Sequence, residues 1–550
     1  MQRVSGGEAL VQSLIRHGVD TVFGLPGVQT YAVFDALARN TDKIQGFYTR
    51  HEQGAAYMAF GYARSTGRPG VYCVVPGPGV LNSTGALCTA WGCNEPVLCV
   101  TGQVPSAFIG KRRGHLHELP NQLATMQTLT KWAARIDDVT ATPQVIDRAF
   151  HEMLSGRHGP VSVEMAWDVM ARKVEVPAGV DPTVPAAALL SPDQISAAAK
   201  LIAESKNPMI AVGSGALDAS EEVLALAEML DAPVTSNRSG RGIVSDDHPL
   251  GVNSVQGFEL WGDVDLIIGI GSRLEVPYLR WCGPRHFAKR PEHPKLIRID
   301  IDPEEMTRMA PDAAVVGDSR AAVAALVQQL ETTIDKRSGR RDKIAEAKAV
   351  GDQRTDTLQP QSGFVRAIRA ALPREGILVD EVCQPGYVAL AAHPVYAPRT
   401  FISSGFQGTL GFGYATSLGV KAAHPNKPVV SMNGDGGFMF GLSELSTAAQ
   451  HNLGVVAVVF NNDAYLNVRR DQKRLFDGRV VGSDLKTPNF AALAETFGVR
   501  GSRADTPAEL QSQLEQRLEA DEPALIEVPI AKDSEVSPWS VLMPGVSSQG

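Results

Sequence analysis

Two polar turns with the residue types of a metal and phosphate site lie in the last third of the sequence. The first is Gly434-Asp435-Gly436-Gly437, directly after the apolar run 429–433, and the second is Asn461-Asn462, directly after the apolar run 455–460. Both runs predict buried strands, and the helical pattern over 442–452 between them completes a βαβ unit. Because ligands of open parallel sheets bind beyond the carboxyl ends of the strands, we expect Asp435 and Asn462 to converge on one point.

The oxygen atoms of this βαβ unit suit a magnesium ion and a diphosphate. The carboxylate of Asp435, the amide oxygen of Asn462 and a main-chain carbonyl, which we assign to Ala464, form the hard-oxygen set that Mg²⁺ prefers. A diphosphate would complete its octahedron. Gly436 and Gly437, like Gly434 in the same turn, would let backbone N–H groups approach phosphate oxygens without an intervening Cβ.

This arrangement resembles the cofactor fingerprint of the thiamin-diphosphate (ThDP) enzymes, in which G-D-G is followed by paired asparagines, here 26 positions after the aspartate. A segment far upstream, YTRHEQGAAYMAFGYARSTGRPGVYCVVPGPGVLNSTGAL, is similar to the family's pyrimidine-binding domain and places Glu52 where the family has its activating glutamate. The resemblance implies that Glu52 shares a proton with N1′ of the aminopyrimidine, so that the 4′-imino group can remove the C2 proton. A sheltered carboxyl group suits this role, because desolvation favours its neutral form.

Residues 403–413 are similar to a turn of acetolactate synthases in which an apolar side chain wedges between the two rings of the cofactor. Leu410 matches that wedge, which would hold the cofactor in a V and bring its base close to C2. The resemblance also implies cofactor contacts from further loops in both halves of the chain. These contacts are assigned to Pro26, Gly27, Asn82, Cys383, Gln384 and Gly408.

The elements that must position these residues alternate along the chain between apolar strand-like runs with glycine-rich exits and amphipathic helical runs. This alternation predicts an α/β fold of three domains, each with a central, mostly parallel sheet flanked by helices. We place a pyrimidine-binding domain at 1–175, a middle Rossmann-like domain at 190–335 and a diphosphate-binding domain at 360–535. A C-terminal tail at 536–550 is expected to be draped over the surface or partly disordered.

Two stretches predict the boundaries between these domains. Residues 176–192 are rich in Pro and Ala and have little periodicity, which is typical of a linker. The charged run around 335–360 predicts a solvated linker helix.

Composition limits the class of partner. The 550 residues include 52 Lys and Arg against 60 Asp and Glu, a formal charge of −8, without a basic block, which argues against nucleic acid. The sequence has neither an apolar run long enough to span a membrane nor an apolar signal core at its start, so we expect a cytoplasmic protein without a membrane partner. Its six cysteines form no C-x-x-C pair and are expected to be reduced and structural.

The resemblance implies a reaction at the carbonyl carbon of a small 2-oxo acid or related carbonyl compound, through a C2 carbanion and an enamine. Long stretches are most similar to acetolactate synthase catalytic subunits, which implies a carboligase or decarboxylase. Those synthases have Phe-Gln at His117-Glu118 and Trp at Asp471, and their flavin-binding Arg-Phe-Asp run is absent from IGIGSRLEVP. Acetolactate formation and FAD binding therefore both stay open.

Benzaldehyde lyase and cyclohexane-1,2-dione hydrolase, related members of the family, use polar pocket residues to move substrate protons. Gln29 and His117 could act in this way here, with His115 a weaker candidate. The alternative function is therefore a lyase or hydrolase of acyloins or 1,2-diones. A third alternative is a catalytically silent ThDP-binding regulatory subunit, against which the retained Glu52 argues.

The resemblance further implies that the cofactor bridges the pyrimidine-binding domain of one subunit and the diphosphate-binding domain of another. We therefore expect a homodimer at least, and a homotetramer as a dimer of dimers. Arg469, Arg470 and Lys473 follow the metal motif and could orient a substrate carboxylate, although a solvated helix face is the simpler interpretation.

Overall fold

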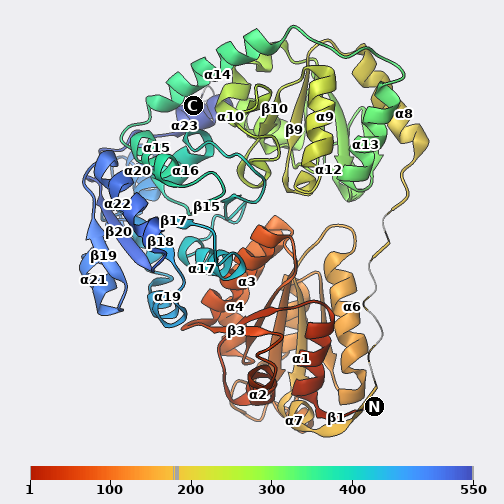
Figure 1. Ribbon diagram of the computed structural model, residues 1–550, viewed down its shortest axis with the longest axis vertical. Helices are drawn as coiled ribbons and strands as arrows, with labels where there is room; N and C mark the ends of the chain where they lie inside the picture. Colours follow the sequence, from red (N-terminus) through yellow and green to blue (C-terminus); the bar gives the residue numbers. More distant parts are fainter. Residues whose placement is uncertain (1, 178, 180–181, 183–184, 187, 548–550) are drawn as a thin grey trace.

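Three six-stranded parallel sheets, each covered by helices, make up the computed structural model. The structure describes residues 2–177, 179, 182, 185–186 and 188–547. Figure 1 shows the first sheet at the bottom in red to orange, the second at the top in yellow to green and the third at the left in teal to blue. The predicted α/β class with three sheet-centred units is confirmed, and every strand pair within these sheets is parallel.

The first sheet has the strand order β3-β2-β4-β5-β7-β6. Its four central strands are buried along their whole length because helices cover both faces, as the apolar runs predict. The strands are β2 (Thr21–Gly24), β3 (Gln45–Tyr48), β4 (Gly70–Val74), β5 (Val97–Gln103), β6 (Trp132–Ile136) and β7 (Val161–Ala166). The helices are α1 (Gly6–Arg16), α2 (Tyr31–Arg39), α3 (Glu52–Thr66), α4 (Pro78–Cys93), α5 (Gln122–Leu129), α6 (Thr142–Leu154) and α7 (Trp167–Ala171). A separate antiparallel pair joins β1 (Gln2–Ser5) to β8 (Lys173–Val176).

The second sheet has the order β11-β10-β9-β12-β13-β14, the doubly wound order of a Rossmann fold. Its strands are β9 (Pro208–Val212), β10 (Val234–Ser236), β11 (Gly251–Val252), β12 (Leu266–Ile270), β13 (Lys295–Asp300) and β14 (Ala313–Val316). Its helices are α8 (Pro192–Glu204), α9 (Ser220–Leu230), α10 (Ser254–Phe258), α11 (Pro284–Ala288), α12 (Glu304–Arg308) and α13 (Ser319–Leu330).

The third sheet has the order β16-β15-β17-β18-β20-β19, which is the topology of the first sheet repeated. Its strands are β15 (Ile377–Asp380), β16 (Phe401–Ile402), β17 (Val429–Gly434), β18 (Val455–Asn461), β19 (Arg500–Arg503) and β20 (Ala524–Pro529). Its helices are α15 (Gln361–Ala371), α16 (Gln384–Ala392), α17 (Gly413–Ala423), α18 (Asp435–Phe438), α19 (Leu445–His451), α20 (Leu466–Leu475), α21 (Phe490–Thr496) and α22 (Pro507–Ala520). The single helix predicted over 442–452 is instead a 3₁₀ turn, Leu442–Glu444, followed by α19.

The first and third units share a continuous hydrophobic core, with α3 packed against α17 (Figure 1). The two helices approach closely enough that a Cβ on Gly61 would collide with the Thr416 carbonyl oxygen, and one on Gly419 with the backbone of Met58. Phe412, just before α17, places its ring against Phe60 of α3, with centroids 5.3 Å apart. Glycines in the two helices therefore fix how these units meet.

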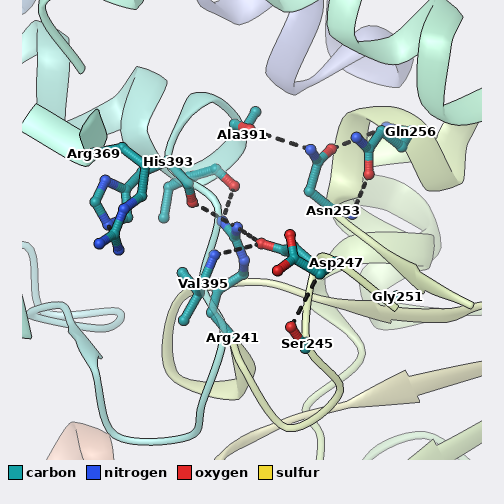
Figure 2. Close-up of polar contacts among 12 residues, drawn as sticks. Arg241, Ser245, Asp247, Gly251, Asn253, Gln256, Arg369, Ala391, His393 and Val395 are labelled. Atoms are coloured by element: carbon teal, nitrogen blue, oxygen red, sulfur yellow. Dashed lines mark hydrogen bonds and ion pairs between the residues drawn. The ribbon is translucent and has the colours of Figure 1, made fainter. Parts of the chain in front are cut away.

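A buried polar cluster joins the second and third units (Figure 2). Arg241, whose side chain is fully buried, pairs with Asp246 at 2.5 Å and donates to the carbonyl oxygen of His393 at 2.9 Å. Asp246 also accepts the backbone N–H of Val395, at 2.7 Å. Arg241 and Asp246 both belong to the second unit, so the hydrogen bonds that they make to His393 and Val395 of the third unit hold the two units together.

The charged run 335–360 forms the predicted helix, α14 (Arg341–Asp356), but one of its faces is docked and not solvated. Ile344 and Ala347 are buried, and α14 packs against α10. Lys348 donates to three main-chain carbonyl oxygens, including that of Gly251 at 2.9 Å. The docked face is hard to recognise in the sequence, because its few apolar residues lie among many charged ones.

The C-terminal segment lies against the body of the protein, one of the two predicted alternatives, and forms α23 (Trp539–Leu542) and α24 (Pro544–Ser547). Residues 548–550 and part of the predicted 176–192 linker lie outside the described residues. None of the described helices is long and apolar enough to cross a membrane.

Candidate active site

Each sheet has a topological switch point, where the connections from two adjacent central strands leave in opposite directions, and ligands of doubly wound folds bind there. In the third sheet this point lies between β15 and β17, which end at the Glu381–Gln384 turn and at Gly434-Asp435. In the first sheet it lies between β2 and β4, followed by Pro26-Gly27 and by the turn into α4. The sequence-predicted site residues thus gather at two switch points.

Asp435 is buried and is the central group of the diphosphate side. Its Oδ1 accepts from the backbone N–H of Gly436 at 2.7 Å, and its Oδ2 accepts from the N–H groups of Asn462 at 3.2 Å and Ala464 at 3.3 Å. The three residues predicted to hold a metal therefore lie together. Burial raises the pKa of Asp435 above its ordinary value, while these backbone N–H groups oppose the rise.

The amide of Asn462 is oriented by a carboxylate. Its Nδ2 donates to Glu535 Oε2 at 2.8 Å, while its Oδ1 is buried without a hydrogen-bond partner among the described residues. Buried polar atoms are normally satisfied, so an oxygen left free beside a carboxylate indicates an absent ligand. This donor set fits Mg²⁺, although the described residues contain no group of three His, Cys, Asp or Glu side chains placed to bind a metal.

The turn after β15 contributes a second buried carboxyl group. Glu381 Oε1 accepts the backbone N–H of Gly411 at 2.5 Å, which ties this turn to the loop that carries Leu410. Burial raises the pKa of Glu381 to about 8 and that of its neighbour Asp380 to about 7. Cys383 begins α16, and burial holds the pKa of its thiol well above the ordinary value. Such a thiol is not nucleophilic, which agrees with a purely backbone role for Cys383.

The glycines of the metal turn face side chains of their own chain. A Cβ on Gly436 would collide with the ring of Tyr465, and one on Gly437 with Glu381 Oε1. A Cβ on Gly434 would lie 3.0 Å from the Cβ of Cys383. The sequence predicts glycine at these positions because phosphate must approach the backbone closely. Packing against side chains of the same chain is a second reason why no Cβ fits there. Gly408 has a φ of 55°, a conformation that favours glycine, two residues before Leu410.

On the pyrimidine side, Glu52 is the first residue of α3 and lies at the domain edge. Its Oε2 accepts a hydrogen bond of 3.0 Å from Asn82 Nδ2, on α4. A Cβ on Gly79 would lie 3.4 Å from Glu52 Oε1 and 2.7 Å from Val75. Gly27, after Pro26, also packs on Val75, which leaves no room for a side chain there. The start of α4, with Gly79 and Asn82, therefore lies beside Glu52, and Gly27 packs on the same valine as Gly79.

Gln29 and His117 lie 88 positions apart and are in direct contact. His117 Nδ1 is 2.9 Å from Gln29 Oε1, and Gln29 Nε2 donates to the carbonyl oxygen of Leu116 at 2.9 Å. His117 has a φ of 67°, and its carbonyl oxygen lies 2.5 Å from where a Cβ on Gly77 would be. The structure therefore places the two residues predicted to move protons in one hydrogen-bonded pair, at the loop beside the β2/β4 switch point.

Two neighbours of His117 do not join that pair. The ring of His115 packs against Phe108, with centroids 4.2 Å apart. Glu118 accepts the backbone N–H groups of Gly114 at 2.7 Å and His115 at 3.1 Å. Desolvation acts to raise the pKa of Glu118, but these N–H groups hold it below its ordinary value. Glu118 thus shapes the loop that presents His117.

The three cationic residues after the metal motif have different surroundings. Arg469 and Lys473 pair with Asp533 at 2.6 and 2.7 Å, as expected for an ion-paired helix face. Arg470 instead donates to Gln384 Oε1 at 3.2 Å and to the main-chain oxygen of Glu535 at 3.2 Å. It therefore links the predicted cofactor residue Gln384 to the C-terminal segment. Asp471 lies on the more open side of α20, 3.5 Å from Arg474.

Sequence reasoning missed two buried acids, Glu444 and Glu535. Glu444 Oε1 accepts the backbone N–H of His51 at 3.0 Å and so fixes the start of α3 directly before Glu52. Glu535 lies 73 positions after Asn462, in a segment without periodicity, and no signal in the sequence connects them. Burial raises the pKa of Glu535 to about 7, against the opposing effect of the Asn462 hydrogen bond.

The switch point of the second sheet opens on a cavity of about 260 Å³. Gly213, Gly271, Arg273 and Asp300 line it from the strand ends, and Phe406 reaches it from the third unit. Arg273 stacks on Phe406, with its guanidinium carbon 4.9 Å from the ring centroid.

Three α/β units with buried carboxyl and amide groups beyond the strand ends are typical of a class of cofactor-dependent enzymes, and the chain belongs to the thiamine pyrophosphate enzyme family. Family models match it over three segments: the N-terminal TPP binding domain at residues 4–125, the central domain at 195–326 and the C-terminal TPP binding domain at 383–528. Its members form or cleave carbon–carbon bonds, so the chain is an enzyme of this kind.

Curated relatives match over nearly the whole chain. A protein of Pseudomonas aeruginosa named "Probable 2-ketoarginine decarboxylase AruI" is 33% identical over 521 residues, 93% of this chain and 91% of its own length. A "Probable acetolactate synthase large subunit" of Methanocaldococcus jannaschii is 33% identical over 96% of this chain and 92% of its own. The "Acetolactate synthase large subunit" of Haemophilus influenzae is 32% identical over 94% and 92%. The predicted membership of the acetolactate synthase and decarboxylase group is confirmed.

Proposed function

We propose that the protein is a ThDP- and Mg²⁺-dependent carboligase or decarboxylase that acts on a small 2-oxo acid. The observation that carries the proposal is the buried, unpartnered Oδ1 of Asn462, a residue whose backbone N–H contacts Asp435 at the strand ends of a TPP-binding unit. Relatives named for acetolactate synthesis and for 2-ketoarginine decarboxylation support the substrate class.

The residues of the diphosphate side and those of the pyrimidine side would have different roles. Asp435, Asn462 and the Ala464 carbonyl oxygen would hold Mg²⁺, and the turns at Gly436-Gly437 and at Cys383-Gln384 would hold the diphosphate. Leu410 would stand between the rings of the cofactor. Bound ThDP supplies the nucleophilic carbon and the electron sink for the bond that forms or breaks.

Glu52 would hold one proton at Oε1, because Oε2 is already engaged by Asn82. The Gln29–His117 pair would pass a proton to or from the substrate oxygen, with Gln29 fixing the orientation of the imidazole ring. Leu116 anchors Gln29 in turn, so the pair is held before substrate arrives.

We further propose that the active enzyme is a homodimer or a dimer of such dimers, with each site shared between two subunits. Among the described residues, no hydrogen bond or ion pair connects Glu52 or Asn82 to Asp435 or Asn462 of the same chain. Exposed large apolar side chains flank both sides, which supports a covered face. They are Leu81 and Trp91 on α4 and Met439 and Phe440 after α18.

Complementation tests this shared site. Two inactive variants, E52Q and D435A, are co-expressed; a mixed dimer then contains one intact site, and random pairing restores about a quarter of the wild-type activity. Absence of any recovery in purified mixed dimers would show that each subunit builds its own site.

Incubation of the ThDP- and Mg²⁺-loaded protein with pyruvate and a panel of longer 2-oxo acids tests the reaction. We expect release of CO₂ and formation of an aldehyde or a 2-hydroxy ketone. The panel includes a guanidinium-bearing 2-oxo acid, because of the relative named for 2-ketoarginine. No turnover across the panel would refute the proposal.

The Gln29–His117 pair favours a second candidate, cleavage or hydrolysis of acyloins or 1,2-diones without loss of CO₂, because that chemistry needs proton transfer at the substrate hydroxyl. Product analysis on these substrates separates the two. We propose that neither reaction uses FAD, which an absorbance spectrum of the purified protein checks. The cytoplasmic location stays a prediction of the sequence.

A further inference from the structure

Glu535 is a buried carboxylate of the C-terminal segment that contacts the metal side of the site. It is 6% exposed, and its Oε2 lies 2.8 Å from Asn462 Nδ2. An asparagine amide can point either its oxygen or its nitrogen in a given direction. In its ionised form the Glu535 carboxyl group accepts hydrogen bonds and cannot donate one, so this contact keeps the nitrogen on the Glu535 side and the oxygen on the other.

The oxygen that is thereby turned away is the unpartnered Oδ1 of Asn462. It belongs to the residue whose backbone N–H contacts Asp435 Oδ2 at 3.2 Å. Rotation of the amide by half a turn would present two N–H donors to the metal side, and these repel a cation. One hydrogen bond thus decides whether Asn462 can act as a metal ligand.

Glu535 is itself held in place by the segment around it. Its main-chain oxygen accepts from Arg470 Nη2 at 3.2 Å, and Gln361 Nε2 donates to the next carbonyl oxygen, that of Val536, at 2.7 Å. Trp539 Nε1 donates to Asn467 Oδ1 at 2.9 Å, and its ring packs against Tyr387 with centroids 4.8 Å apart. The segment is therefore docked on both sides of Glu535.

We propose that Glu535 is a positioning residue for the metal site: it orients the Asn462 amide so that Oδ1 faces Mg²⁺. This inference rests on the proposed function, because it concerns the same metal. Partners in the outer shell of a metal site typically contribute 10- to 100-fold to metal affinity.

Calorimetric titration of Mg²⁺ into the ThDP-saturated full-length protein tests the inference. We expect E535A to bind Mg²⁺ about 10- to 100-fold more weakly than the wild type. E535Q offers Asn462 Nδ2 an acceptor oxygen without the charge but can also present its own N–H, so we expect a loss of Mg²⁺ affinity smaller than that of E535A. At saturating Mg²⁺, kcat of E535A recovers to within a few-fold of the wild type.

The matched control is D533N, which removes the same charge two residues away on the exposed face and leaves Asn462 untouched. It should bind Mg²⁺ like the wild type. Combining E535A with N462A should weaken binding no further than N462A alone, because the oriented ligand is already absent. Thermal melting without cofactor separates loss of metal affinity from loss of folding.

Equal losses of affinity in E535A and E535Q would overturn the inference in favour of simple charge attraction. Wild-type affinity in a folded E535A would also overturn it and leave the proposed function standing. If the wild-type protein binds no Mg²⁺ with ThDP, the proposed function itself fails.

Discussion

The first and third units share one strand order and place opposite kinds of site at the same switch point. On the diphosphate side, Asp435 is buried and already makes three hydrogen bonds to backbone N–H groups, two of them from Asn462 and Ala464. On the pyrimidine side, Glu52 lies at a helix start, and among the described residues its side chain accepts a hydrogen bond from Asn82 alone. The repeated topology thus supplies a rigid anchor in one unit and an open face in the other.

This difference separates binding from chemistry. A buried and satisfied network is suited to hold an ion and a diphosphate, because it needs little rearrangement when they bind. An open face with an available carboxyl group is suited to meet a partner surface and a reacting ring. Substitutions on the diphosphate side should therefore change the affinity for Mg²⁺ and ThDP, and substitutions on the pyrimidine side should change kcat. The predictions below begin with the largest expected effect.

The largest expected effect is that of E52Q on the pyrimidine side. Glutamine cannot exchange the proton that Glu52 Oε1 would hold, so kcat should fall by about 10²- to 10⁴-fold. Affinity for ThDP, measured by fluorescence titration, should change by no more than a few-fold. Residual activity near the wild-type level would remove Glu52 from the proton-transfer role.

The second effect is that of D435A on the diphosphate side. Loss of the central carboxylate should weaken Mg²⁺ and ThDP binding by more than about 100-fold. Removing a residue that only hydrogen-bonds to a metal ligand already weakens metal binding by up to about 100-fold. Excess Mg²⁺ should restore part of the activity, unlike in E52Q. If E52Q and D435A change the same kinetic parameter equally, the division between the two sides is wrong.

The third effect is that of H117N, which breaks the contact with Gln29. We expect kcat/KM for substrate to fall by about 10²-fold, the lower end of the range for proton-transfer groups. H115N is the matched control, since His115 packs on Phe108 away from Gln29. ThDP affinity should be unchanged in both variants; equal kinetic losses in the two would point to a general effect on the loop.

The smallest effect concerns pH and Glu381. Its folded pKa of about 8 lies above the ordinary 4.5, so the folded protein binds more protons than the unfolded protein between those values. Stability therefore decreases as pH rises through this window. E381Q keeps an acceptor for the Gly411 N–H and should reduce the slope, so that its melting temperature changes less between pH 6 and 8.

Thermal melts of the wild type and E381Q at several pH values check this prediction. A shift of 1 kcal/mol corresponds to about 2–4 °C for a domain of 150–250 residues. Part of the slope should persist in E381Q, because Asp380, with a pKa of about 7, titrates in the same window. Identical slopes in the two proteins would show that Glu381 does not titrate there.

The sequence was sufficient to predict the strands and the turns that follow them, because apolar runs and glycine-rich exits are local signals. Asp435, Asn462 and Ala464 could be predicted together for the same reason, since adjacent parallel strands bring their exits to one edge. Gln29 and His117 could be singled out only through resemblance, and their contact could not be predicted, because it depends on where a loop folds back.

Other features carried no local signal. Glu535 lies in a segment without periodicity, and it reaches the site through a hydrogen bond with Asn462, 73 positions earlier. The docking of α14 could not be predicted from its composition. Lys348 contributes to it through its ammonium group, and the sequence does not distinguish such a lysine from one that is solvated. Tertiary contacts of polar side chains are therefore what the sequence pattern could not supply.

The position of β20 in its sheet has a consequence for the order of events during synthesis. This strand, Ala524–Pro529, lies between β18 and β19, so that β19 has no other neighbour in the sheet. Units near the amino terminus can fold while translation continues. The third sheet cannot close until β20 has left the ribosome, so the C-terminal TPP-binding unit matures after the N-terminal one.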